Sequence, residues 1–182
     1  MFEQIKGRHD AKCDIFTIDT AMGLAFSPFT ARMIDKARKK KQRLTSAING
    51  RRTQAIESRL AESLSSVHTI ADHRDNDDPV SKGFSDFILY QKQSAIVSNY
   101  VTLFQSYAKY VGAYKRYLQK LENRLFSYFS GASLYVRIDP KVNSDITRLD
   151  PGLREPPMIP GLQALYDRIP EYLRETLPTI TI

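Results

Sequence analysis

A long stretch with two parallel apolar seams, residues 82–130, most constrains what this chain can fold into. Apolar residues recur there in steps of about four and three, which places each seam along one face of an α-helix. We predict a helix over 82–130 that ends at Gly131 in a left-handed cap. The first seam is Ile96, Tyr100, Leu103, Tyr107, Tyr110, Tyr114, Tyr117, Leu121 and Tyr128, and the second is Val97, Val101, Phe104, Ala108, Val111, Leu118, Leu125 and Phe129.

A second, more polar helix is predicted over residues 27–75, starting with Ser27 as N-cap and Pro28 as first helical residue. Its apolar seam is thin, and Asn49-Gly50 falls in its middle. This dipeptide is either a turn or a tolerated glycine, and we favour a continuous or kinked helix. The run from Asp75 to Pro79 stops it, and Ser81 or Ser85 caps the next helix.

A link of six residues makes the two helices antiparallel neighbours, each about 70 Å long at ~1.5 Å per residue. Three short runs resemble strands: Asp14–Asp19, Ser133–Ile138 and Thr179–Ile182. The predicted fold is mainly α: an elongated antiparallel helical hairpin, a small β element at its base and an extended proline-rich C-terminal arm. The corresponding segments are 1–26, 27–130 and 131–182.

Seven of the nine prolines lie between Pro140 and Pro178. We expect 139–160 to be extended and irregular, followed by two short helices within Leu162–Ile169 and Pro170–Leu177. Apolar residues recur through this segment more often than in a disordered tail. It is therefore either an arm that docks along another surface or a lid over the core of its own domain.

The tyrosine-rich face of 82–130 is too wide for the thin seam of 27–75 to cover. Other copies of the chain, another protein or the returning C-terminal segment would have to cover it. Because the spacing is that of packing residues, base stacking is disfavoured, and buried hydroxyls will need hydrogen-bond partners. The predicted interface residues are Tyr100, Leu103, Tyr107, Tyr110, Tyr114, Tyr117 and Leu121.

The net charge of +7 is concentrated on the predicted helices, with eleven Lys and Arg against five Asp and Glu in 27–75. This favours a polyanionic or acidic neighbour over that helix, namely nucleic acid phosphates, an acidic protein or anionic lipid. A solvated basic face without a partner is the alternative. The candidate anion-binding residues are Lys36, Arg38, Lys39, Lys40, Lys41, Arg43, Arg51 and Arg52.

Several function classes find no support in the sequence. Nucleotide-binding, hydrolase and metalloprotease motifs are absent, and no paired carboxylates stand out, so we predict neither an enzyme nor a bound cofactor. His68, Asp72 and His73 with the acidic run after them fail the EF-hand pattern, and no metal site is predicted. The single cysteine, Cys13, excludes an intramolecular disulfide, and no apolar run suits a secretory signal or a membrane span.

These features favour a non-catalytic structural subunit of a large oligomeric assembly, with its basic helix facing nucleic acid or an acidic neighbour. A virion component, such as a phage head–tail or ejection-apparatus protein, fits, as does part of a secretion machine. A cytoplasmic location, or one inside an assembled particle, follows. The alternatives are a stand-alone, sequence-nonspecific nucleic-acid-binding protein and an enzyme of unrecognised type.

Overall fold

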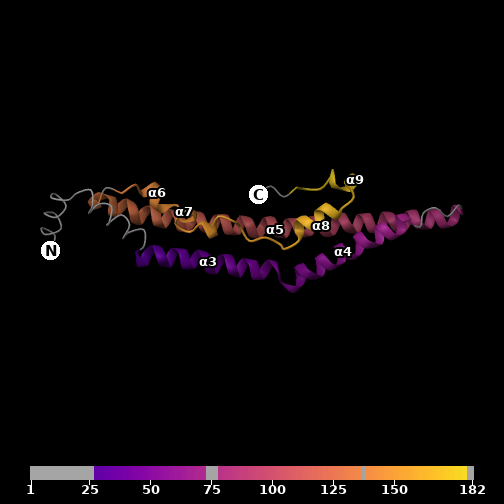
Figure 1. Cartoon of the computed structure of the whole chain (residues 1–182), viewed down its shortest axis with the longest axis horizontal. Coiled ribbons are helices and arrows are strands. Elements are labelled where there is room, and N and C mark those ends of the chain that lie inside the picture. The colour runs from indigo at the N-terminus through magenta and orange to yellow at the C-terminus, as the bar shows by residue number, and fades with distance from the viewer. Residues whose placement is uncertain (1–26, 73–77, 137, 180–182) are drawn as a thin grey trace. The chain divides into compact units, whose positions relative to one another are not determined.

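The computed structural model describes residues 27–72, 78–136 and 138–179 of the chain, and in these the fold is mainly helical, as predicted (Figure 1). No strand occurs among the described residues. None of their helices combines the length and apolarity that a membrane crossing requires. The elements are α3 (Pro28–Ile48), α4 (Arg51–Asp72), α5 (Pro79–Val136), α6 (Pro140–Ser144), α7 (Ile146–Leu149), η1 (Pro151–Leu153), α8 (Leu162–Arg168) and α9 (Glu171–Arg174).

A capping residue followed by proline starts four of these elements. The side chain accepts backbone N–H bonds of the first turn, while proline, which has no N–H to satisfy, occupies the first helical position. The prediction for Ser27-Pro28 is confirmed, whereas α5 is capped by Asp78 and not by Ser81 or Ser85. The bonds are Thr30 N to Ser27 Oγ (3.3 Å), Ser81 N to Asp78 Oδ2 (3.2 Å), Lys141 N to Asp139 Oδ1 (2.9 Å) and Gly152 N to Asp150 Oδ1 (3.1 Å).

The continuous or kinked helix that we favoured over 27–75 is instead two helices, because α3 ends at Ile48 and α4 begins at Arg51. Gly50 donates its N–H to the Ala47 carbonyl (3.3 Å), and its own carbonyl accepts from Gln54 to open the new helix. A Cβ added at Gly50 would lie 3.1 Å from the Ala47 oxygen. Glycine therefore permits a close backbone approach at this break.

α5 is longer than predicted, and the strand predicted at Ser133–Ile138 is wrong because Ser133–Val136 continue the helix. Gly131 lies inside α5 and does not cap it; the left-handed glycine among the described residues is Gly161. The Ser133 hydroxyl donates to the Ser130 carbonyl (2.8 Å), a bond compatible with helix. Gly131, which is not followed by a helix-breaking residue, therefore does not end the helix.

The prediction of an extended, irregular segment over 139–160 is wrong for its first part, which contains α6, α7 and η1, whereas residues 154–160 form no regular element. The aspartates Asp139, Asp145 and Asp150 begin these three elements by accepting backbone N–H bonds. Pro140 and Pro151 are thus the first residues of α6 and η1. The helix predicted in Leu162–Ile169 is α8, and α9 occupies four residues of the predicted Pro170–Leu177 helix.

The other two strand predictions fall largely outside the description. Asp14–Asp19 lies entirely outside the described residues. Of Thr179–Ile182 only Thr179 is described, and it belongs to no regular element. The small β element therefore has no counterpart in the part of the chain that is described.

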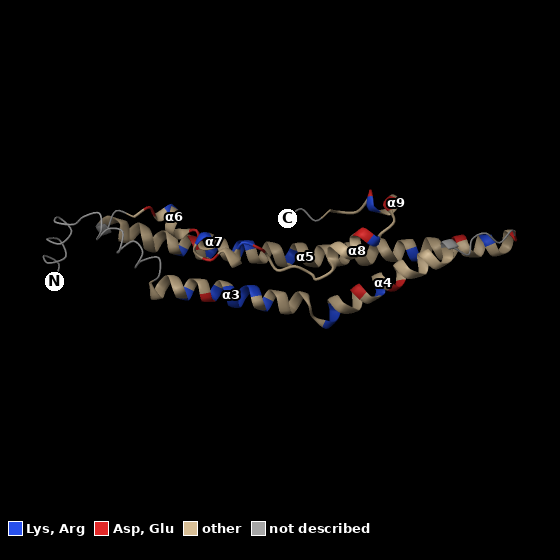
Figure 2. Cartoon of the chain, viewed as in Figure 1, with Lys and Arg blue, Asp and Glu red and all other residues tan. Residues whose placement is uncertain are grey.

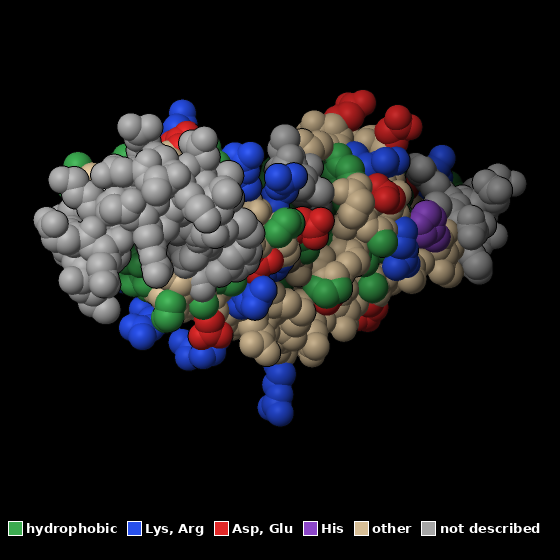
Figure 3. Space-filling view, turned by 60° about the vertical axis from the view of Figure 1, so that its left-hand side comes forward, with side chains coloured by type: hydrophobic (Ala, Val, Ile, Leu, Met, Phe, Trp, Pro, Cys, Tyr) green, Lys and Arg blue, Asp and Glu red, His purple; other side chains and the backbone are tan. Residues whose placement is uncertain are grey.

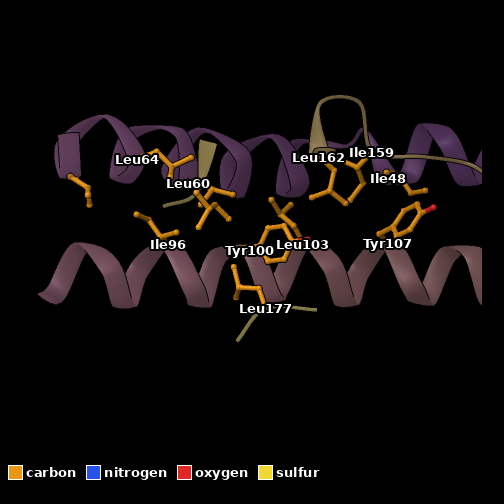
Figure 4. Packing of buried hydrophobic residues seen from close by; sticks show 12 residues of the cluster. Ile48, Leu60, Leu64, Ile96, Tyr100, Leu103, Tyr107, Ile159, Leu162 and Leu177 are labelled. Carbon is orange, nitrogen blue, oxygen red and sulfur yellow. The ribbon is translucent and has the colours of Figure 1, made fainter. Parts of the chain in front are cut away.

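The described chain forms two compact units, which both contain part of α5. Unit 1 combines residues up to 44 with 112–157, and unit 2 combines 45–111 with residues from 158 onward. In unit 2, Leu60 and Leu64 of α4 point toward Ile96 and Tyr100 of α5 (Figure 4). Side chains after α5 complete this core: Ile159, Leu162, Ile169 and Leu177.

Unit 1 buries the seam of α3 and the later part of the α5 seams. The Phe29 and Tyr128 rings stack with centroids 4.4 Å apart, so the start of α3 packs on the end of α5. Residues of α7 and η1 are also fully buried, among them Ile146 and Leu153. The buried residues of α3 and α5 in this unit are Met33, Ala37, Leu44, Tyr114, Leu118, Leu121, Leu125 and Phe129.

Candidate anion-binding surface

The predicted basic cluster lies on α3 in unit 1, except that Arg51 and Arg52 begin α4 in unit 2 (Figure 2). Because consecutive helical residues point about 100° apart, the cluster does not form a single surface. The buried residues Met33, Ala37 and Leu44 define the inward side of α3. Each cation can be placed relative to that side.

Two cations of the cluster bind the segment that follows α5. The Arg38 guanidinium pairs with the Asp150 carboxylate at 2.8 Å, and the Lys41 ammonium donates to the Gly152 carbonyl at 2.8 Å. Asp150 simultaneously caps η1. Arg38 and Lys41 therefore have an internal role that the sequence reasoning missed.

Lys40 contacts an aromatic ring of α5. Its ammonium lies 5.6 Å from the centroid of the Tyr117 ring, within the range of a cation–π interaction. This contact is on the flank of α3 that also carries the stacked Phe29 ring. The angular positions of these side chains around the helix place Arg38 and Lys41 on the other flank.

Four cations form a row along the outer side of α3. Arg32, Lys36, Lys39 and Arg43 follow each other in steps of four, three and four, the spacing of one helical face. We call these four residues the basic stripe. At ~1.5 Å per residue it extends about 16 Å. Arg32 was absent from the predicted cluster, although the spacing would have identified it.

The basic stripe retains most of its charge for an external ligand. Lys39 pairs with Asp35 at 2.8 Å, but both side chains are exposed, and such surface pairs contribute only ~0–1 kcal/mol. Arg32, Lys36 and Arg43 form no ion pair within the described part of the chain. On the face shown in Figure 3, acidic side chains are interspersed with basic ones, so positive charge is not uniform over the surface.

The predicted interface residues are mostly buried within the two units. Tyr100, Leu103, Tyr107, Tyr114 and Leu121 are buried, while Tyr110 and Tyr117 are half-buried. The segment that follows α5, one of the three predicted covers, lies over two of these tyrosines. A role for the predicted interface residues in binding another chain stays a prediction.

Two tyrosine hydroxyls hold that segment through its backbone. Tyr114 donates to the Leu153 carbonyl at 2.9 Å in unit 1, and Tyr100 donates to the Pro178 carbonyl at 3.0 Å in unit 2. Burial raises the pKa of each tyrosine to about 12, with smaller contributions from Asp150 near Tyr114 and from Tyr166 near Tyr100. Both hydroxyls therefore remain protonated donors at neutral pH.

The described residues contain no group of three or more side chains suited to hold a metal ion. His68 is exposed on α4, and His73, Asp75 and Asp77 lie outside the described residues. The pKa of Glu57 is raised by burial, and its Oε1 atom is buried without a hydrogen-bond partner. Glu57 is not among the described residues that line either pocket.

No protein family, curated protein or solved structure matches this chain.

Proposed function

We propose that this chain is a non-catalytic structural subunit of a larger oligomeric assembly, with α3 facing a polyanion. The observation that carries this proposal is an exposed apolar row at the start of α5. Val80, Phe84, Phe87 and Tyr90 follow in steps of four, three and three, and they are 79%, 66%, 58% and 68% exposed. Large apolar side chains grouped in this way mark association surfaces.

The occupant that we propose for this apolar row is a second copy of the chain. Two copies related by a two-fold axis would place the same row against itself, the commonest arrangement of soluble oligomers. Burying an exposed Phe contributes about 1.5–3 kcal/mol, so Phe84 and Phe87 from two copies supply a substantial part of a dimer's affinity. The elongated hairpin with a docking arm is the architecture that we propose for the assembled subunit.

The basic stripe supplies the second surface of this subunit. Phosphates of nucleic acid, or an acidic neighbouring protein, would complement its four cations. A virion component or a part of a secretion machine is the kind of assembly that combines these surfaces, with the chain located in the cytoplasm or within the assembled particle. A stand-alone nonspecific nucleic-acid-binding protein is the second candidate, favoured by the same stripe.

Sedimentation velocity over a concentration series tests the assembly proposal. Wild-type chain should associate with increasing concentration, and the Phe84→Ser/Phe87→Ser variant should remain monomeric. Phe126→Ser/Leu134→Ser is the matched control, because it also removes two exposed apolar side chains of α5. A wild-type monomer throughout the series, or equal loss of association in both variants, would contradict the proposal.

A further inference from the structure

A second basic surface, which the predicted cluster does not include, lies on α5 in unit 1. It is an open groove of about 740 Å³. Arg116, Lys120 and Arg124 line it at intervals of four residues, so they share one side of the helix and stand about 6 Å apart along its axis. Among the described residues that line the groove there is no Asp or Glu. Its electrostatic field therefore favours an anionic ligand.

A row of neutral polar residues accompanies these cations. Gln119, Asn123 and Ser127 also line the groove with the same interval of four. The Gln119 amide donates to the Asn123 side-chain oxygen (3.2 Å), and the Ser127 hydroxyl donates to the Asn123 backbone carbonyl (3.0 Å). Amide and hydroxyl groups in this row retain hydrogen-bonding capacity for sugars and base edges.

An aromatic pair closes one end of the groove. Phe29 of α3 and Tyr128 of α5 both line it, and their rings stack at 4.4 Å with an interplanar angle of 21°. Cations in a line, polar groups beside them and an aromatic surface are the elements of sites that bind single-stranded nucleic acid without sequence preference.

The register of α3 on α5 brings the basic stripe to the same flank. Phe29 contacts Tyr128, and Lys40 contacts Tyr117, so the two helices run antiparallel in this unit. The chain between Phe29 and Lys40 carries Arg32 and Lys36. These two residues consequently lie along the same stretch of α5 as Lys120 and Arg124.

Asp150 and Glu122 of unit 1 lie on the other flank, whereas Asp35 pairs with Lys39 on the basic stripe. Asp150 binds Arg38, and the Glu122 carboxylate lies near Asp145 and the backbone of Ile146. Burial, followed by the nearby Asp145 charge, raises the pKa of Glu122. The segment following α5 therefore occupies the flank opposite the groove and leaves the groove flanked by cations.

We propose that this groove, extended by the basic stripe of α3, binds single-stranded nucleic acid through its phosphates. This inference rests on the proposed function, in which α3 faces a polyanion. It identifies that polyanion as single-stranded nucleic acid. It favours one strand over a duplex because a single line of cations with an aromatic end follows one backbone. It favours nucleic acid over an acidic protein because stacked rings and a polar row accompany the cations.

Fluorescence anisotropy with a labelled oligothymidylate, titrated with the full chain at several salt concentrations, tests the proposal. Arg116→Gln/Lys120→Gln/Arg124→Gln should reduce the salt slope by about 2, since each single-strand phosphate contact contributes about 0.7. If the two proteins bind equally at a 1 M salt reference, this difference in slope makes the variant bind about 100-fold more weakly than the wild type at 0.1 M salt. Arg59→Gln/Lys82→Gln/Lys92→Gln removes the same charge from unit 2 and should change binding much less.

Three results would overturn the inference. Equal losses in both triple variants would mean that only net charge matters. Tighter binding to a duplex of equal length would exclude a single-strand site, and equal competition by a polyglutamate peptide would assign the groove to an acidic protein. Far-UV circular dichroism of both variants establishes that they fold. Sedimentation velocity reports on the oligomer separately, so failure of nucleic-acid binding and failure of assembly are distinguishable.

Discussion

The hydroxyl of Tyr114 links the segment after α5 to the core of unit 1, and its removal should loosen that segment. The Tyr114 ring and Leu153 are each 1% exposed, and the hydroxyl donates to the Leu153 carbonyl at 2.9 Å. Tyr114→Phe keeps the ring and leaves a buried carbonyl without this donor. Such a loss costs about 1–3 kcal/mol, because the carbonyl's desolvation is no longer compensated.

Hydrogen exchange measured by mass spectrometry gives the most direct readout of this change. Amides of α7 and η1 should exchange about 5- to 150-fold faster, which is the same free energy expressed as an opening equilibrium. Urea denaturation followed by circular dichroism should show a reduced free energy of unfolding. Tyr117→Phe is the control, because Tyr117 is half-buried on the same helix and its ring can still face Lys40. Equal exchange in the two variants would refute the anchoring role.

Three further measurements test the described structure. Tyr100 and Tyr114, with pKa values raised to about 12, should titrate last in an absorbance titration, and stability should fall as pH rises from 10 through 12, because only the unfolded state ionises readily there. Gly131→Ala should raise the free energy of unfolding by about 0.4–1 kcal/mol, because Gly131 lies inside a helix; the same change at a left-handed cap would destabilise the chain instead. Gly50→Ala should raise the thermal unfolding temperature less, because its Cβ would crowd a carbonyl oxygen. Burial raises the pKa of Glu57 above its usual value of 4.5, so the free energy of unfolding should fall as pH rises from 4.5 through the raised pKa. Glu57→Gln should therefore stabilise the chain at pH 7, and an unchanged urea midpoint would contradict this.

Long periodic stretches were the predictable part of the fold. The seam from Ile96 to Tyr128 follows from helical geometry, and Ser27-Pro28 is an unambiguous helix start. The ends of α5 were not predicted well, because Gly131 was interpreted as the end of the helix. Asp78-Pro79 was interpreted only as the end of the preceding helix, although an acidic cap followed by proline equally begins the next one.

The sequence predicted which residues of α3 are basic, but not the direction in which each side chain points. Basic residues in 36–43 are evident in the sequence, and their division between two roles depends on the inward side that Met33, Ala37 and Leu44 define. Helical spacing alone would have grouped Arg32 with Lys36, Lys39 and Arg43. The partners of Arg38 and Lys41 lie more than a hundred residues along the chain, and no local pattern reports such a contact.

The opposite flanks of α3 explain how one basic helix can serve two purposes. On one flank, Asp150 satisfies both the first turn of η1 and the Arg38 guanidinium, so a single carboxylate joins the returning segment to α3. That arrangement places Asp150 on the flank where the chain packs on itself, whereas Asp35 pairs with Lys39 on the basic stripe. The other flank, bounded by Phe29 and Lys40, carries cations from both α3 and α5, and the described residues that line its groove include no Asp or Glu. A polyanion bound there would not have to displace the returning segment, and internal anchoring and external binding can therefore coexist.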